Sequence, residues 1–299
     1  MKQLILRALV ALLSRAQIRK PFFRLLTAIF ADNRELAHAG LRALSTALDP
    51  RSDRPMAEAV LSRLTSCGYE PVNPDAPYYV QHLTPGRGPE TNRYDAYQRV
   101  WVKFDIQPGE KVLDIGSGHI PFPLATALAD LYEGDTDHRA KAALVKDARP
   151  FAKCSIETMP FADGEFDFVY CSHVLEHVQH PGRACREIMR IGRRGYIETP
   201  TRTSDVMFNF TRLKGHHQWY IQLVDHTLVF IEWTDAERRD LGVGDFLELF
   251  HSRWDNPFQQ LVGKNRDMFV NMLLWKRQFS FVVIDKRGTI VDQHWAPRP

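Results

Sequence analysis

A carboxylate and a pair of glycines stand close together in the stretch Lys111 to Gly118, KVLDIGSG, and could bind a charged ligand. The apolar residues around Asp114 predict a buried strand, and the two glycines predict a tight turn that a ligand can approach closely. Pro121 and Pro123 suit the first turn of a helix, where a backbone N–H has no partner. This order of strand, turn and helix predicts the first unit of a doubly wound α/β sheet, a nucleotide-binding place.

The glycines alone do not decide which nucleotide binds. A dinucleotide loop has a third glycine where this chain has Pro121, and the GxGxG pattern of methyltransferases has one where it has Ile120. Asp114 would repel a pyrophosphate at short range. It suits S-adenosylmethionine (SAM), whose near end carries an ammonium and a sulfonium. The expected contacts of SAM in this loop are Asp114, Gly116, Ser117 and Gly118.

A second stretch, MPFADGEFDFVYCSHVLEHV from Met159 to Val178, resembles the middle of class I SAM-dependent methyltransferases, in the Rossmann-like group called type 11. In that group VLDIGSG is the first motif, an LPF-x-DGxFD segment precedes the fourth strand, and SHVLEH follows it. The resemblance covers roughly residues 95 to 200, with the motifs in the family's order. It implies a Rossmann-like fold, SAM as the cofactor and methyl transfer as the reaction.

Other cofactor contacts are expected where later strands end. The second strand of this fold commonly ends in an acid that binds the ribose hydroxyls, about 20 residues past the first glycine. Asp135 and Asp137 both fit this distance, and we favour Asp135 because it directly ends the apolar run. For adenine, the resembled group often has an aspartate where this chain has Ser155. We therefore expect adenine contacts from the Ser155 hydroxyl and the backbone of Ile156 and Glu157.

The strand FDFVYCS ends at the edge of the sheet where ligands of open α/β sheets bind. We expect Cys171 and Ser172 to contact the cofactor. His173 is a candidate general base, because neutral imidazole has a suitable pKa, and orienting the cofactor is the other interpretation. His173 and His177 stand four residues apart but lack a third ligand, so no metal site is expected.

These residues require an α/β, doubly wound, Rossmann-like and mostly parallel sheet. We expect residues 1–92 to form a helical cap and loop-rich arm, residues 93–201 the SAM-binding core, and residues 202–299 an acceptor-side addition. In that addition we expect a hairpin around Val224 to His226, a helix from about Asn265 to Lys276, and a closing strand, FSFVVID. Side chains that are candidates to line the acceptor pocket are His216, His217, Trp219, Trp233 and Trp254.

Charge and cysteine content limit the partners and the compartment. The net charge is only +3, and eight Lys or Arg against three acids stand in residues 1–50, so the core lacks the basic excess of a nucleic-acid-binding protein. The four cysteines form no CxxC pair and indicate a reduced, cytoplasmic protein. Residues 1–30 form either a basic amphipathic arm on the inner face of a membrane, or helices that pack on the core or a second subunit, which leaves a homodimer open.

The function we predict is transfer of a methyl group to an oxygen or nitrogen (or carboxylate) of a small molecule, glycan or lipid-linked metabolite. One alternative is a catalytically silent SAM-binding partner subunit. The other is an NAD-dependent oxidoreductase, which Asp114 and Pro121 disfavour.

Overall fold

The computed structural model describes residues 33–48, 101–134, 142–208, 216–235 and 257–296, and the single positions Pro21, Leu25, Ala28 and Arg139. The rest of the predicted cap and arm (residues 1–92), including all of its loop-rich segment, lies outside the described residues, as do Asp135, Asp137 and Trp254. The elements along the chain are α3 (Arg34–Leu48), β1 (Val112–Ile115), β2 (Ala127–Asp130), β3 (Phe151–Lys153), β4 (Phe168–Ser172), η3 (Leu175–His177), α5 (Pro181–Ile191), β5 (Arg194–Pro200), α6 (Arg202–Met207), β6 (Trp219–Val224), β7 (Thr227–Glu232), α9 (Pro257–Lys264), η5 (Arg266–Met268), β8 (Val270–Lys276), β9 (Ser280–Ile284) and β10 (Ile290–His294).

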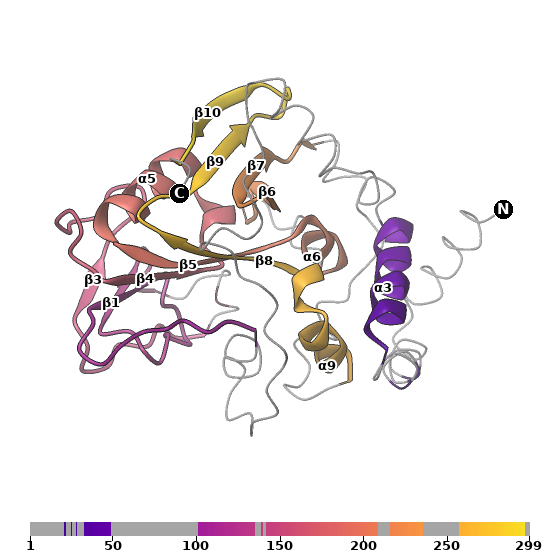
Figure 1. Cartoon of the computed structure of the whole chain (residues 1–299), viewed down its shortest axis with the longest axis horizontal. Coiled ribbons are helices and arrows are strands. Elements are labelled where there is room, and N and C mark those ends of the chain that lie inside the picture. Colours follow the sequence, from indigo (N-terminus) through magenta and orange to yellow (C-terminus); the bar gives the residue numbers. More distant parts are fainter. Residues whose placement is uncertain are drawn as a thin grey trace.

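The central sheet has six strands in the order β3-β2-β1-β4-β5-β8 (Figure 1). Neighbouring strands from β3 to β5 pair in parallel, whereas β8 runs antiparallel to β5. The order reverses at β1, which lies between β2 and β4, and ligands of such sheets bind beside this reversal at the carboxyl ends of the strands. The predicted Rossmann-like, mostly parallel sheet is confirmed.

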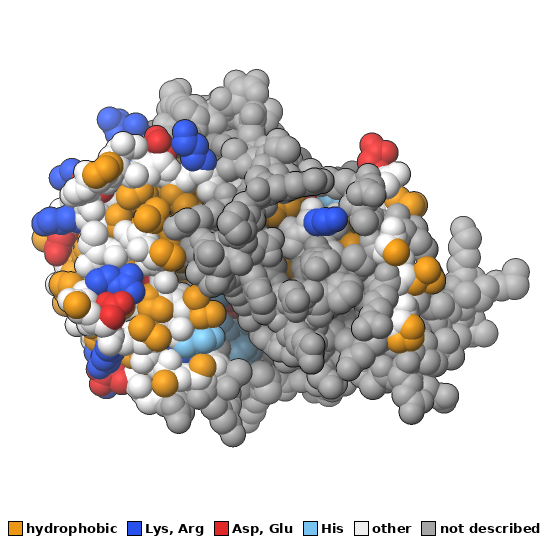
Figure 2. Space-filling view, turned by 90° about the horizontal axis from the view of Figure 1, so that it is seen from below, with side chains coloured by type: hydrophobic (Ala, Val, Ile, Leu, Met, Phe, Trp, Pro, Cys, Tyr) orange, Lys and Arg blue, Asp and Glu red, His pale blue; other side chains and the backbone are white. Residues whose placement is uncertain are grey.

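The two faces of this sheet are covered in different ways. On one face, α5 and residues of the second sheet pack on Leu113 and Ile115 of β1. On the other face, Val112 packs in a layer of aromatic rings. In this layer Phe122 stacks on Tyr170 with ring centroids 4.2 Å apart. Hydrophobic side chains lie among charged ones on the surface of the molecule seen from below (Figure 2).

The connection from β1 to β2 contains no helix, so the helix predicted near Pro121 is wrong. Two side chains form hydrogen bonds with the backbone of this connection instead. Asp114 accepts the N–H of Phe122 at 2.7 Å, and Arg149 donates to the carbonyl oxygens of Phe122 and Ala125. These bonds replace the internal hydrogen bonds of a helix. As a result the second strand begins early and ends at Asp130.

Helix α5 is bounded by a proline and a glycine, residues that commonly start and stop helices. It begins at Pro181 and is capped at its end by Gly192, whose N–H donates to the carbonyl oxygen of Ile188. Ala184, Ile188 and other apolar residues of one face are fully buried against the sheet. The helix thus covers the face that carries Leu113 and Ile115.

The chain after residue 201 contributes to two sheets. The predicted hairpin is confirmed as β6 and β7, joined by Asp225 and His226 in the left-handed region. These strands form a second sheet in the order β10-β9-β7-β6. The prediction that FSFVVID closes the central sheet is wrong, because this segment is β9 of the second sheet, where it pairs with β7 in parallel. The helix predicted from Asn265 to Lys276 is wrong, because β8 pairs along the edge of β5. Since β8 completes the central sheet, a boundary at 201 does not separate two folded units.

One helix of the predicted cap is described. Asn33 caps α3 by accepting the N–H of Leu36 at 2.9 Å. His38 of α3 lies 3.6 Å from Asp267 of η5, so this helix packs on the rest of the protein. Among the helices that the structure describes, none combines the length and the apolar character needed to cross a membrane.

Candidate active site

The loop after β1 has the backbone shape that its glycines predict. Gly116 has φ +72° and Gly118 has φ +55°, both in the left-handed region. The amides of Gly116 and Ser117 donate to the carbonyl oxygen of Ala129, at 2.7 and 3.1 Å. The amide of Gly118 donates to the carboxylate of Asp130 at 3.0 Å. All three loop amides are therefore engaged with β2.

This arrangement does not suit a pyrophosphate. Phosphate sites of dinucleotide folds use free amides at the N-terminus of the helix that follows the loop. Here the amides of residues 116–118 have protein acceptors, and residues 119–126 form no helix. Two carboxylates, Asp114 and Asp130, lie close enough for the charge of one to raise the pKa of the other. The local charge favours a cationic ligand.

Asp114 is 2% exposed and lies on the aromatic face of the sheet. Burial raises the pKa of its carboxyl group to about 7, against the N–H of Phe122 and the charge of Arg149, which lower it. The structure thus gives Asp114 a part in holding the β1–β2 connection. Its contact with a ligand ammonium stays a prediction.

Asp130 was missed by the sequence analysis. It ends β2, beside the glycine loop, at the position that a ribose-binding acid occupies in this topology. Its two oxygens accept the N–H groups of Gly118 and Tyr132, each at 3.0 Å, and Arg139 lies 3.7 Å away. The sequence did contain a signal for Asp130, because the short apolar run ALAD ends in this acid. The longer run, which ends at Asp135, predicts a longer strand instead.

Of the other predicted cofactor residues, Ser117 lies in the glycine loop, and Ser155, Ile156 and Glu157 follow β3. The Ser117 hydroxyl is buried and has no hydrogen-bond partner among the described residues. The Ser155 hydroxyl accepts the N–H of Glu157 at 3.2 Å. The Glu157 carboxylate accepts two backbone N–H groups, of Gln179 and His180, at the start of α5. Between Ser155 and Glu157, the side chain of Ile156 is buried. Adenine contacts at these positions stay predictions.

A charged centre, formed by Glu198, Arg266, His173 and Glu176, lies where β4 and β5 end. Glu198 is completely buried and accepts hydrogen bonds from Arg266, from the Tyr196 hydroxyl at 2.5 Å, and from other neighbours. The pKa of Glu198 is lowered, because the charges of Arg266 and His173 outweigh its burial. Ser172 also donates to Glu198, at 3.3 Å, while Cys171 is buried with a pKa raised by burial.

His173 faces two carboxylates. Its Nε2 lies 3.2 Å from Glu198 and its Nδ1 lies 3.4 Å from Glu176. Partial burial of the ring lowers the pKa of His173, but the nearby carboxylates of Glu176 and Glu198 prevail and raise it to about 9. Correspondingly, the pKa of Glu176 is lowered to about 2, although burial opposes this. A protonated imidazole has no lone pair to accept a proton, so this geometry gives no support to His173 as a general base.

Comparison with known proteins identifies the part of the chain that holds this loop. Residues 113–197 match the family model described as a methyltransferase domain. The match begins within β1 and ends within β5, so it spans the parallel part of the sheet. Residues 113–197 are a methyltransferase domain. The predicted methyltransferase family, and with it SAM as the cofactor, are confirmed for this domain.

Curated relatives match the same region. An uncharacterized methyltransferase of Mycobacterium leprae (strain Br4923) is 38% identical over 104 residues, which is 32% of this chain and 39% of the relative. One of Mycobacterium tuberculosis (strain ATCC 25618 / H37Rv) is 32% identical over 106 residues, or 32% of this chain and 41% of the relative. The chain therefore spans about two fifths of the length of the curated relatives it matches.

Solved structures with some likeness include the YcgJ protein of Bacillus subtilis, at 14% identity and TM-score 0.30, covering 57% of this chain and 92% of that one. Another is a SAM-dependent methyltransferase of Aquifex aeolicus, at 15% identity and TM-score 0.23, covering 31% of this chain and 57% of that one. At these TM-scores, the match of residues 113–197 remains the basis for the methyltransferase domain.

The first glycine of the methyltransferase domain is expected to tolerate no side chain. A Cβ at Gly116 would lie 2.3 Å from Val174 Cγ2, in addition to the strain of its positive φ. We expect Gly116→Ala to lower the free energy of unfolding by about 2 to 5 kcal/mol in urea denaturation. Gly109→Ala is the matched control, because φ is +88° there but no atom lies within 4 Å. Equal losses in both variants would contradict the clash with Val174.

Proposed function

We propose that the whole chain is a SAM-dependent methyltransferase that methylates an oxygen or nitrogen (or carboxylate) of a small molecule, glycan or lipid-linked metabolite. The observation that carries this proposal is the match of residues 113–197 to the methyltransferase-domain family, over strands β1 to β5. An NAD-dependent oxidoreductase is not supported, since the loop amides are engaged within the protein.

The residues around the loop fit SAM. Asp114 and Asp130 provide negative charge on two adjacent strands, which suits the ammonium and sulfonium of the cofactor and the hydroxyls of its ribose. The buried Ser117 hydroxyl, without a partner among the described residues, is a further polar group at the loop. The positive φ of Gly116 and the absence of its side chain leave room for Val174 beside the loop.

Bound SAM supplies an electrophilic methyl carbon, so the protein needs chiefly to align the acceptor's lone pair with the S–CH₃ bond. The ends of β4 and β5 carry the groups that would do this on the acceptor side. The charged centre holds them rigidly, because Glu198 links Ser172 and His173 of one strand end to Arg266. With His173 protonated, acceptors that are already anionic, such as carboxylates, need no base from this residue.

Calorimetry of the full chain tests the cofactor assignment. We expect SAM and S-adenosylhomocysteine to bind with one site per chain, and NAD to give no binding heat. Transfer of a labelled methyl group from SAM to an extract of the producing cells then tests the activity. Tight SAM binding without transfer to any acceptor would favour a catalytically silent SAM-binding subunit. Binding of NAD but not SAM would overturn the proposal.

Asp130, rather than Asp135, is proposed to bind the ribose hydroxyls. We expect Asp130→Asn to weaken SAM binding by about 1 to 3 kcal/mol, the cost of losing hydrogen bonds to a charged acceptor. Asp135→Asn should leave the affinity unchanged, because β2 already ends at Asp130. Isothermal titration of both variants with SAM decides between them. The reverse pattern would return the role to Asp135.

A further inference from the structure

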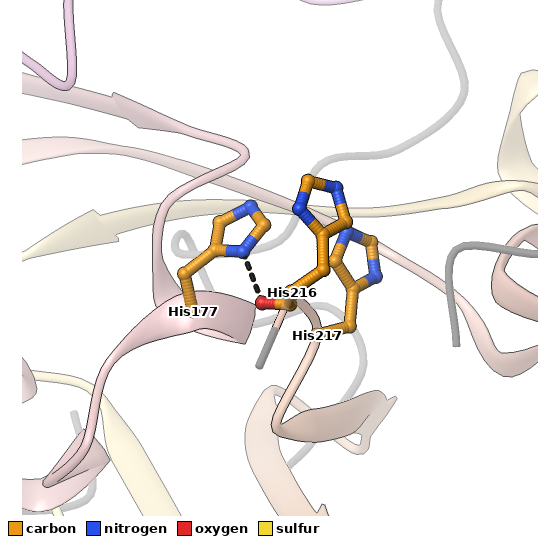
Figure 3. A group of neighbouring side chains, drawn as sticks. All are labelled: His177, His216 and His217. Carbon is orange, nitrogen blue, oxygen red and sulfur yellow. Dashed lines mark hydrogen bonds between the residues drawn. The ribbon is translucent and has the colours of Figure 1, made fainter. Parts of the chain in front are cut away.

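Three histidines from two distant parts of the sequence meet beside the end of β4. His177 ends η3, and His216 and His217 precede β6; we call these three the histidine cluster (Figure 3). Their ring centroids lie 4.7 to 4.8 Å apart. Each ring offers one nitrogen, and these three nitrogens lie within 4.8 Å of one another. Within the described part of the chain, these three side chains are close enough together to hold a metal ion.

Hydrogen bonds orient two of the rings. His177 donates from Nδ1 to the carbonyl oxygen of His216 at 2.5 Å, the dashed line in Figure 3. His217 donates from Nδ1 to Asp205 of α6 at 2.6 Å, and Asp205 is completely buried. In each neutral ring these bonds leave Nε2 as the nitrogen with a lone pair. A carboxylate or carbonyl that accepts from one ring nitrogen is the usual support of a metal-binding histidine.

A buried carboxylate lies next to the cluster. Glu176 precedes His177, is completely buried, and neither of its oxygens has a partner in hydrogen-bond geometry. Its Oε1 lies 3.7 Å from Nε2 of His177, in the histidine cluster. The same oxygen lies 3.4 Å from Nδ1 of His173, in the charged centre. Burying a carboxylate without hydrogen bonds is costly unless a cation compensates it.

We propose that His177, His216 and His217 bind one zinc ion. Imidazole nitrogens are donors that zinc accepts in a tetrahedral site. Zinc–nitrogen bonds of about 2.0–2.1 Å place tetrahedral ligand atoms ~3.4 Å apart, so the rings close by up to ~1.4 Å on binding. The carboxylate of Glu176 lies beside His177 and adds negative charge next to the ion.

This site would fasten η3, which follows β4 of the central sheet, to the segment that leads into β6 of the second sheet. It does not depend on the proposed methyl transfer. No metal was expected from the sequence, because His177 was paired with His173, four residues before it, and that pair lacked a third ligand. In the fold His173 turns to Glu198, and the partners of His177 come from 39 and 40 residues further on.

Zinc content tests the proposal. The full chain, purified without a histidine tag and dialysed against zinc and then against zinc-free buffer, is expected to retain one zinc per chain by mass spectrometry. His177→Ala and His216→Ala should each weaken zinc binding at least 100-fold in competition with a chelator. Asp205→Asn should weaken it about 10- to 100-fold, because the Asp205 carboxylate orients His217. His180→Ala, at an exposed histidine with no side-chain capping bond, is the matched control and should bind zinc as the unmodified chain does.

Cobalt substitution keeps the test decisive if a variant does not fold. The unmodified chain loaded with cobalt is expected to show the intense visible bands of a four-coordinate site, and zinc should displace them. Less than a tenth of an equivalent of zinc in the unmodified chain, or a cobalt spectrum identical to that of the free ion, would overturn the proposal. So would equal zinc content in folded His216→Ala and the unmodified chain.

Discussion

Replacing Asp114 with asparagine is expected to weaken SAM binding on the order of 100-fold at pH 8, and to remove most of its pH dependence between pH 6 and 8. The carboxylate is buried, so its attraction to a cationic ligand is weakly screened. With a pKa of about 7, the ionised fraction of Asp114 rises from about a tenth at pH 6 to about nine tenths at pH 8. In the unmodified chain SAM affinity should therefore rise about tenfold over this range.

Calorimetry at pH 6, 7 and 8, in two buffers of different ionisation enthalpy, measures both the affinity and the proton released on binding. Other titrating groups of SAM and of the protein contribute equally in the unmodified chain and in Asp114→Asn. The difference between the two chains in how SAM affinity changes with pH therefore reports the ionisation of Asp114. A flat affinity in the unmodified chain, or an equal slope in Asp114→Asn, would show that this carboxylate does not face the cofactor's charge.

Stability provides an independent readout of the same carboxyl group. Its folded pKa lies above the ordinary value of 3.8, so its contribution to stability is complete below that value and is lost as the pH rises through about 7. The shift corresponds to about 4 kcal/mol in total. We therefore expect the stability of Asp114→Asn relative to the unmodified chain to increase between pH 6 and 8 in urea denaturation, which also shows that the variant folds.

The second large effect is expected at Glu198. Substituting Glu198→Gln removes the negative charge that faces the buried guanidinium of Arg266. Breaking a buried pair by removing one partner costs about 3 to 5 kcal/mol. We expect that loss in the free energy of unfolding, measured with urea. The expected loss is large because Glu198 also accepts from Tyr196 and faces His173.

An exposed ion pair provides the matched control. Arg193 lies 2.8 Å from Asp167, but its side chain is 70% exposed. Such surface pairs contribute about 0 to 1 kcal/mol. Asparagine at position 167 keeps an oxygen that can accept the N–H of Lys111, which Asp167 accepts at 3.0 Å, so Asp167→Asn should cost less than about 1 kcal/mol. If Glu198→Gln and Asp167→Asn lose the same stability, the buried pair of Glu198 and Arg266 does not stabilise the protein as we expect.

The sequence predicts well the features that depend on local residue order. Gly116 and Gly118 indicate their own turn, Pro181 and Gly192 bound α5, and the hairpin of β6 and β7 follows from two apolar runs on either side of Asp225 and His226. These signals lie within a few residues of the structure they specify. The methyltransferase resemblance rests on motifs of the same kind, and the family match confirms it.

The features that the sequence did not predict depend on distant residues. The stretch from Pro121 lacks a helix because Asp114 and Arg149 bind its backbone, and β8 is a strand because the edge of β5 is open to pair with it. We propose Asp130 rather than Asp135 as the ribose-binding acid for the same reason, since β2 already ends at Asp130. The histidine cluster unites positions about 40 residues apart, which no local spacing reveals.

The coil between β1 and β2 has a consequence for how this protein tolerates change. The backbone groups of a helix bond to one another. In this coil they bond instead to two side chains, Asp114 on β1 and Arg149 after β2. Mutations at Arg149, far from the glycine loop in sequence, should therefore disturb the cofactor loop and the packing of Phe122 together. In related chains, the residues at positions 114 and 149 are expected to change together, and to change with the length of the coil between β1 and β2.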